Sequence, residues 1–265
     1  MTDPRQTRKP VAVVTGAGGD IGRAIAEELA STHVIAVVDI DLESAADTAR
    51  ILTEQGCSAT AVQCDITRDD SVASMAAATR ELGPVGLLIN NAGAARVLSL
   101  QRLTVSDMQA DLDLNLAGAM RCFKAFEDDL KSAGAVVNIA SVNGMGTYGH
   151  PVYSAAKAGL IQFTRALAVE YGRFGLRANA VAPGTVRTQA WQAREAENPD
   201  VFNEALRWYP LKTLPSPQDI AKAVAFLSGP DARCITGICL AVDSGLNAGS
   251  PDLPRTFTQS DDFSH

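Results

Sequence analysis

The stretch that decides the fold runs from Val11 to Gly22 and reads VAVVTGAGGDIG. Its first five residues are apolar or β-branched without alternation, which is typical of a parallel strand covered by helices on both faces. The glycines that follow let the backbone turn tightly and approach a phosphate, and a helix beginning after them offers free N–H groups and a partial positive charge. Because such loops also occur as tight turns without a ligand, the stretch predicts a strand–loop–helix unit and only suggests a phosphate site.

Short apolar runs alternate with longer amphipathic segments along the rest of the chain. The predicted strands are Val11–Thr15, Val34–Asp39, Thr60–Cys64, Leu87–Asn90, Ala135–Ser141, Arg177–Ala182 and Cys239–Val242. The predicted helices are Ile21–Ser31, Leu42–Gln55, Asp69–Leu82, Thr104–Leu130, Tyr153–Tyr171 and Pro217–Ser228. This order predicts an α/β fold, a Rossmann-like doubly wound sheet of about seven parallel strands with helices on both faces. We expect one domain over residues 11–246, an N-terminal tail (1–10), and a polar C-terminal tail (247–265) that is mobile or docked on a partner.

Composition and charge argue against several classes of function. The 265 residues carry 23 Lys and Arg against 30 Asp and Glu, and this net charge of −7 disfavours a nucleic-acid or anionic-membrane partner. The longest uncharged stretch, 132–156, is too rich in glycine to span a membrane, and the apolar run 11–14 is too short for a signal peptide. The five cysteines form no CxxC pair, so we expect reduced thiols in a cytoplasmic protein. With three histidines, none at ligand spacing to a cysteine, we expect no metal site.

An acidic residue closes the second predicted strand. Asp39 lies 17 residues beyond Gly22, where a carboxylate can accept hydrogen bonds from the hydroxyls of a ribose. The same carboxylate would repel a 2′-phosphate, and residues 17–20 and 38–41 contain no Lys or Arg to bind one. These features predict NAD(H) as the cofactor in preference to NADP(H). A helix cap is the alternative role for an acid here, and it suits Asp41 better than Asp39.

Three residues fit acid–base chemistry beside such a cofactor. Tyr153 and Lys157 are four positions apart, hence on one helix face, and Ser141 ends a predicted strand at the edge where parallel sheets bind ligands. Hydride transfer at a carbinol carbon requires proton transfer at its oxygen. A tyrosine, with a pKa of about 10, can do this near neutrality when a neighbouring ammonium favours its phenolate. A Tyr-x-x-x-Lys pattern arises by chance in about one such sequence in ten and is weak on its own, so the prediction depends on the order of the whole set.

From about residue 11 to residue 245 the sequence resembles the short-chain dehydrogenase/reductase family. The family's motif T-G-x-x-x-G-x-G matches residues 15–22 except at Asp20, where the family has a glycine. We expect the Asp20 carboxylate to turn away from the pyrophosphate and cap a helix that begins at Ile21. Asn-Asn-Ala-Gly at 90–93 and Pro-Gly at 183–184 resemble the family's later cofactor motifs.

The resemblance implies a role for each site residue. Ser141 fixes the substrate oxygen, and Tyr153 is the acid or base. Lys157 also holds the ribose hydroxyls, and Asn115 keeps a water that links Lys157 to solvent. The residues implied to contact the cofactor are Gly16, Gly19, Asp20, Ile21, Asp39, Asp65, Ile66, Asn91, Ala92, Gly93, Tyr153, Lys157, Pro183, Gly184, Val186 and Thr188. Of these, Asp65 and Ile66 would contact the adenine.

The sequence says less about which substrate the protein binds. The resemblance implies that residues 188–214, here called the cover, lie over the active site, and both tryptophans, Trp191 and Trp208, fall within it. These rings, together with Asn143 and His150 near the base, are the predicted substrate contacts, and packing within the protein is an equally good interpretation of each. The mixture of aromatic, amide, imidazole and basic groups suggests a polyol, a sugar or a hydroxy acid.

The sequence therefore predicts an NAD(H)-dependent oxidoreductase that interconverts a secondary alcohol and a carbonyl compound, and the resemblance implies a homotetramer. Two alternatives stay open. A 3-oxoacyl-thioester reductase of the same family normally prefers NADPH, against which Asp39 argues. A non-catalytic dinucleotide-binding scaffold would be signalled by the loss of Tyr153 or Lys157, and both are present.

Overall fold

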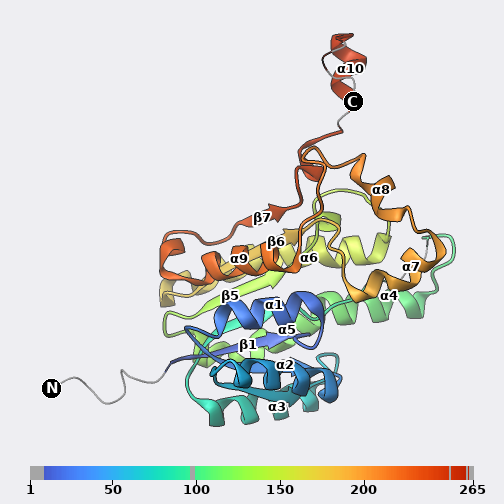
Figure 1. Cartoon of the computed structure of the whole chain (residues 1–265). Helices are drawn as coiled ribbons and strands as arrows, with labels where there is room; N and C mark the ends of the chain where they lie inside the picture. The colour runs from blue at the N-terminus through green and yellow to red at the C-terminus, as the bar shows by residue number, and fades with distance from the viewer. Residues whose placement is uncertain (1–8, 96–98, 251, 261, 263–265) are drawn as a thin grey trace.

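The computed structural model describes residues 9–95, 99–250, 252–260 and 262. Seven parallel strands form one sheet in the order β3-β2-β1-β4-β5-β6-β7 (Figure 1). They are β1 (Val11–Thr15), β2 (Val34–Asp39), β3 (Ala59–Gln63), β4 (Val85–Asn90), β5 (Ala135–Ile139), β6 (Arg177–Pro183) and β7 (Cys239–Val242). The strand order reverses between β1 and β4, which is where doubly wound sheets bind ligands. The predicted fold is confirmed.

Helices cover both faces of this sheet (Figure 1). One face carries α1 (Asp20–Leu29), α2 (Leu42–Glu54) and α9 (Pro217–Ser228), and the other carries α3 (Asp69–Leu82), α5 (Gly118–Leu130) and α6 (Pro151–Tyr171). Alternate residues of β1 enter the two cores, Ala12 and Val14 in the first and Val11 and Val13 in the second. Burial on both faces explains why the strands are unbroken apolar runs.

Two predicted elements differ from the structure: one strand ends earlier than expected, and one long helix is divided into three segments. β5 stops at Ile139, and Ser141 lies beyond it, where its side chain caps a short 3₁₀ turn, Val142–Gly144. The expectation that Ser141 is the last residue of the strand is therefore wrong, because the backbone turns out of the sheet there. The helix predicted over Thr104–Leu130 is α4 (Val105–Leu112) followed by a π-helical turn, Asp113–Ala117, and then α5.

A buried chain of polar side chains crosses the middle of the sheet. Asn90 on β4 donates from Nδ2 to Asn138 Oδ1 on β5 at 2.8 Å, and Asn138 Nδ2 donates to Thr164 Oγ1 on α6 at 2.8 Å. Thr164 completes the chain by donating to the Leu160 carbonyl. Because unpaired buried amides are costly, this chain specifies how β4, β5 and α6 fit together.

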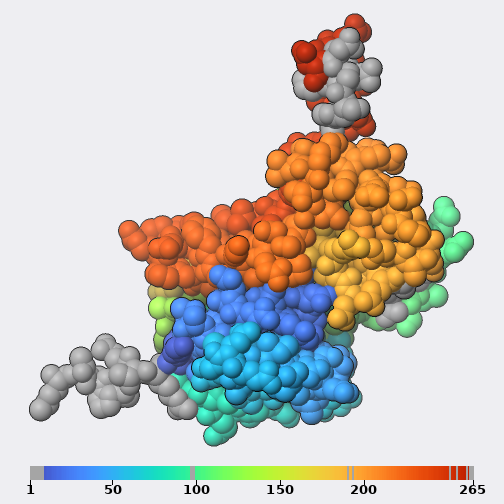
Figure 2. Space-filling view, in the orientation of Figure 1, coloured from blue at the N-terminus to red at the C-terminus, as the bar shows by residue number. Residues whose placement is uncertain are grey.

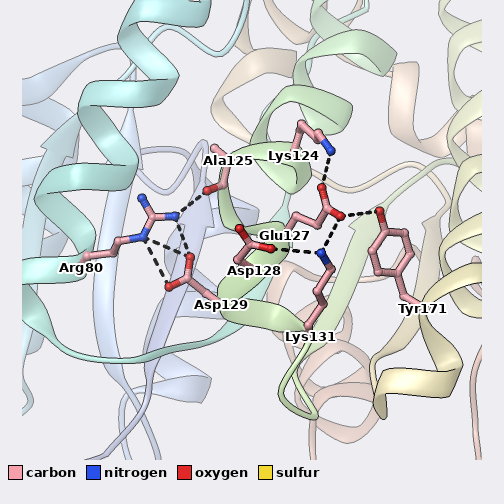
Figure 3. A network of polar contacts seen from close by, with 8 residues as sticks. All are labelled: Arg80, Lys124, Ala125, Glu127, Asp128, Asp129, Lys131 and Tyr171. Carbon is pink, nitrogen blue, oxygen red and sulfur yellow. Dashed lines mark hydrogen bonds and ion pairs between the residues drawn. The ribbon is translucent and has the colours of Figure 1, made fainter.

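A polar network on the outside of the second helical layer joins α3, α5 and α6 (Figure 3). Arg80 on α3 pairs with Asp129 on α5 at 2.7 Å. The Glu127 carboxylate on α5 accepts hydrogen bonds from three neighbours, Lys124, Lys131 and Tyr171. These bonds, that from Lys124 foremost, lower the pKa of Glu127 to about 2. The network orients α5, but its exposure to solvent limits its contribution to stability.

The C-terminal residues leave the body of the protein. A 3₁₀ turn, Leu246–Ala248, packs beside the active-site end of the sheet, and α10 (Leu253–Thr258) projects outward (Figure 1). The predicted N-terminal tail lies outside the described residues apart from 9 and 10, and so do positions 251, 261 and 263–265 of the C-terminal tail. Among the described residues, no helix is both long and apolar enough to cross a membrane.

Candidate active site

Hydrogen bonds between neighbouring strands brace the glycine-rich loop, residues 15–22. The buried Thr15 hydroxyl accepts the backbone N–H groups of Asn91 at 3.0 Å and Ala92 at 3.1 Å. The Asn91 amide donates in return to the carbonyls of Thr15 and Gly16, both at 3.0 Å. The structure thus brings the 90–93 motif against the loop, and the Asn91 side chain acts as a brace.

Two glycines in this loop leave no room for a side chain. A Cβ on Gly22 would lie 2.2 Å from the Gly16 carbonyl oxygen, and one on Gly16, which has a φ of +66°, would lie 2.9 Å from the Ala92 Cα. Gly19, by contrast, is exposed, and a Cβ there would meet nothing closer than 3.7 Å. The first N–H groups of α1 have no intrahelical acceptor. The loop is thus packed tightly against the protein at Gly16 and Gly22 and open to solvent at Gly19, a shape that fits a diphosphate.

Asp20 does not cap the first helix. α1 begins at Asp20 itself, and Gly19 occupies the N-cap position without a side-chain cap. The Asp20 carboxylate instead accepts the Gln189 N–H at 2.7 Å. The expectation of a cap for a helix starting at Ile21 is therefore wrong, because Gly19 already has the extended cap conformation and the carboxylate finds a donor in the cover.

The acids predicted to contact the adenosine lie at two neighbouring strand ends. Asp39 accepts the N–H groups of Gly18 at 2.9 Å and Asp41 at 3.1 Å, which holds its carboxylate at the rim of the loop. Asp41 itself caps α2, in agreement with the role preferred for it from the sequence. Asp65 follows β3, where its Oδ1 is engaged in a turn, and the adjoining Ile66 is buried.

Ser141, Tyr153 and Lys157 converge at the carboxyl end of the sheet. Burial raises the pKa of Tyr153, and a hydrogen bond with the Ser141 hydroxyl partly opposes that shift. The Lys157 ammonium lies 5.5 Å from the centroid of the Tyr153 ring and donates to the Ile139 carbonyl at 2.8 Å. Burial lowers the pKa of Lys157 to about 8. At neutral pH the arrangement therefore presents a protonated phenol, oriented by a hydroxyl and backed by a cation.

The π-helical turn places Asn115 near Gly93, on the side of Lys157. Asn115 is buried, and its side chain donates to the carbonyls of Ala94 at 2.9 Å and Asp111 at 3.0 Å while accepting the Ala94 N–H at 3.1 Å. A Cβ on Gly93 would lie 2.7 Å from Asn115 Oδ1 and 3.2 Å from Lys157 Nζ, so both side chains lie close to Gly93. π-helical turns are frequent at functional sites.

The structure adds one residue that the sequence did not single out, Tyr209. It is 2% exposed, and its hydroxyl accepts the Thr185 N–H at 2.7 Å. Its ring would lie 3.2 Å from a Cβ on Gly184. Tyr209 thus supports the 183–188 segment, in which Val186 is also buried. The sequence showed a cluster of aromatics in the cover, but no signal marked which of them is buried.

The loop before α6 separates two predicted substrate contacts. Asn143 donates to the Gly149 carbonyl at 2.9 Å and to Ser154 Oγ at 3.1 Å, so its amide braces the loop. His150 has a left-handed backbone, with a φ of 51°, and its ring stands edge-on to Tyr153 with centroids 6.5 Å apart. His150 thus stands beside the Tyr153 ring, while Asn143 lies beside Ser141, whose hydroxyl accepts the Asn143 N–H at 3.2 Å.

The cover folds into short helices, α7 (Gln192–Glu197) and α8 (Val201–Leu206), and lies against the first β–α unit (Figure 2). Trp191 packs on Phe202 within the cover, with ring centroids 5.4 Å apart. Trp208 is 48% exposed. The structure therefore gives Trp191 a packing role and leaves Trp208 as the more accessible ring.

Comparisons with known proteins match nearly the whole chain. The family model described as Enoyl-(Acyl carrier protein) reductase matches residues 16–247. A cis-4-hydroxycyclohexanecarboxylate dehydrogenase of Sinomonas cyclohexanicum is 38% identical over 90% of this chain and 96% of that protein. A 3-oxoacyl-[acyl-carrier-protein] reductase of a Synechocystis species is 37% identical over 89% of this chain and 96% of that protein. Among solved structures, an oxidoreductase from Burkholderia thailandensis, described as of the short-chain dehydrogenase/reductase family, has a TM-score of 0.87 and 38% identity, covering 96% of this chain and 99% of that one.

Proposed function

Because the chain belongs to the short-chain dehydrogenase/reductase family, we propose that it is an NAD(H)-dependent oxidoreductase that interconverts a secondary alcohol and its ketone. The observation that carries the proposal is the convergence of Ser141, Tyr153 and Lys157 beside an open glycine-rich loop. A dinucleotide-binding scaffold would need neither the hydrogen-bonded phenol nor the buried lysine.

When bound, the nicotinamide supplies or accepts the hydride. The residues that would hold the cofactor lie along the carboxyl edge of the sheet. They are Gly16, Gly19 and Ile21 at the diphosphate, Asp39 at the ribose, Asp65 and Ile66 at the adenine, and Ala92, Gly93, Pro183, Gly184, Val186 and Thr188 towards the nicotinamide. The carboxylate of Asp39 at the rim of the loop is the ground for proposing NAD(H) over NADP(H).

Tyr153 moves the proton. In carbonyl reduction its hydroxyl donates to the substrate oxygen while Ser141 donates a second hydrogen bond that orients this oxygen. The Lys157 cation stabilises the phenolate that remains. Asn115 holds the backbone at Ala94 and contacts Gly93, and so shapes the space around Lys157. In alcohol oxidation the same groups act in reverse.

Among the substrate classes expected from the sequence, a hydroxy acid has the best support. A relative of 38% identity is named as a dehydrogenase of a hydroxycyclohexanecarboxylate. Near the site, Met145 and Tyr148 are each 41% exposed and Trp208 is 48% exposed, and these side chains offer apolar surface to a hydrocarbon ring. A 3-oxoacyl-thioester reductase is the second candidate, favoured by the family model's description and by a relative of that name.

We also propose a homotetramer in the cytoplasm, with residues 11–246 as the catalytic unit. An apolar groove on the outer face of α5 and α6 supports an interface there. It is lined by Met120, Phe123, Lys124, Phe163, Ala166, Leu167, Glu170 and Tyr171.

The test is a panel of cyclic and linear hydroxy acids, polyols and 3-oxoacyl thioesters, incubated with NAD(H) or NADP(H) and followed by the absorbance of the reduced nicotinamide. Hydride transfer with NAD(H) and a hydroxy acid is the expected result. Efficient turnover of a 3-oxoacyl thioester with NADPH would establish the second candidate. A protein that binds NAD and transfers no hydride to or from any member would be a scaffold.

A further inference from the structure

Near its first residue, the cover is hydrogen-bonded to a residue far away in the sequence. The Gln189 N–H donates to Asp20 Oδ2 at 2.7 Å, across 169 positions. Asp20 stands where the family's motif has a glycine, which offers no side-chain acceptor. The bond therefore comes from this chain's departure from the motif. In Figure 2 the gold surface at the start of the cover abuts the blue surface of the first β–α unit.

The two ends of the cover are anchored differently. At the far end, Tyr209 is 2% exposed and its hydroxyl accepts the Thr185 N–H, while the Leu211 N–H donates to the Ser244 carbonyl at 3.2 Å. At the near end, Gln189 is exposed and Asp20 is half-buried. A buried anchor persists while an exposed hydrogen bond exchanges with water, so the cover has a fixed end and a releasable end.

The same carboxylate also changes the charge at the mouth of the loop. Asp20 is the first residue of α1, beside the helix N-terminus to which the proposed function assigns the cofactor diphosphate. A carboxylate and a diphosphate at one helix N-terminus repel each other and compete for its positive end. A glycine at this position would add no charge.

We propose that Asp20 is a positioning residue that latches the cover to the glycine-rich loop and, through its charge, loosens the hold of the loop on the cofactor. The latch stands on the geometry alone, whereas its effect on the cofactor rests on the proposed function. The two effects act on different ligands and in opposite directions. The hydrogen bond favours a closed cover and so lowers the KM for substrate, whereas the charge weakens NAD binding and so raises its dissociation constant.

Two substitutions separate these effects. Asp20→Ala removes both the hydrogen-bond acceptor and the charge, while Asp20→Asn removes the charge and keeps an amide oxygen as acceptor. Asp69→Ala is the matched control, because Asp69 is the first residue of α3 as Asp20 is of α1 and lies away from the cover. Asp20→Ala and Asp69→Ala therefore carry the same change at the first position of a helix.

Limited trypsin digestion of the ligand-free protein measures the latch, since Arg187, two residues before Gln189, is exposed. Cleavage after Arg187 should be about 3- to 10-fold faster in Asp20→Ala, the effect expected for the loss of one solvent-exposed hydrogen bond, and near the wild-type rate in Asp20→Asn and Asp69→Ala. Calorimetry with NAD alone should show about 3-fold tighter binding in both Asp20 variants. The KM for substrate should rise in Asp20→Ala only.

Equal trypsin rates in wild type and Asp20→Ala would overturn the latch. NAD binding that is unchanged or weaker in both Asp20 variants would overturn the charge effect, because a merely structural residue weakens every function together. Absence of NAD binding to the wild type would overturn the proposed function and the charge effect with it, while the trypsin result would still decide the latch.

Discussion

The glycine-rich loop and the cover meet at the hydrogen bond between Asp20 and Gln189, and they are held in different ways. The loop is tied by buried bonds to distant elements: Thr15 to Asn91 and Ala92 of the β4 end, and Ala17 to Thr48 of α2. Within the cover, Trp191 packs on Phe202, and hydrogen bonds near its two ends, from Gln189 to Asp20 and from Thr185 to Tyr209, join it to the rest of the protein. The proposed chemistry and nucleotide binding therefore rest on the fixed sheet edge, whereas the cover, which the family resemblance implies sets substrate choice, can change without disturbing the sheet.

The largest effect should come from the fixed side. Tyr153→Phe keeps the ring and removes the transferable proton, so turnover should fall by roughly 10²–10⁴ while NAD binding is retained. Stopped-flow absorbance and calorimetry measure the two quantities separately. Trp208→Phe in the exposed cover is the matched comparison, and it should alter KM more than turnover. Near-normal turnover in Tyr153→Phe would remove this residue from the mechanism.

The braces of the loop should matter more for stability than the cover does. Thr15→Val deprives the Asn91 and Ala92 N–H groups of their acceptor, and the free energy of unfolding should fall by about 3 kcal/mol. Trp208→Phe, at a half-exposed position, should stay within about 0.5 kcal/mol of wild type. Urea denaturation of both variants tests the contrast, which similar losses would refute.

Cofactor discrimination should be of intermediate size. Charge-assisted hydrogen bonds contribute about 1.5–3 kcal/mol, so the wild type should prefer NAD over NADP by roughly 10- to 150-fold in kcat/KM. Asp39→Ala should erode the preference, by weakening NAD and relieving repulsion of the 2′-phosphate. Asp41→Ala removes the neighbouring helix cap and should leave the preference intact. Equal efficiency of both cofactors with the wild type would contradict the assignment of Asp39.

The smallest effect is a pH dependence of stability. The pKa of Lys157 is about 8 in the fold against 10.5 for an ordinary lysine, so between these values the unfolded chain binds more protons and stability rises with pH. From pH 7 to 9.5 the wild type should gain about 2 kcal/mol over Lys157→Met, which has no such group. Denaturation of both proteins at the two pH values gives this difference directly. A constant difference would mean that Lys157 is not desolvated.

The same contrast explains what the sequence could predict. Strands buried on both faces are visible as apolar runs, and the spacing of Tyr153 and Lys157 follows from helix periodicity. The predicted strand runs past the end of β5 because Ala140 continues the apolar run as far as Ser141, and only the cap at Ser141 shows the turn. The role of Asp20 and the burial of Tyr209 were not foreseen, because each depends on a partner brought close by the fold and not by any local pattern.

The amide pair in the middle of the sheet has a consequence for how such a chain can evolve. Asn90 and Asn138 are register partners on β4 and β5 and bond to each other in the core. Replacing one leaves the other buried without its partner, at a cost of about 1–3 kcal/mol, whereas replacing both together with apolar residues avoids this penalty. A one-residue insertion in either strand would part them, and an insertion in β5 would also shift Ser141 relative to Tyr153. The two asparagines are therefore expected to be inherited as a unit, and a descendant that keeps one without the other should be rare.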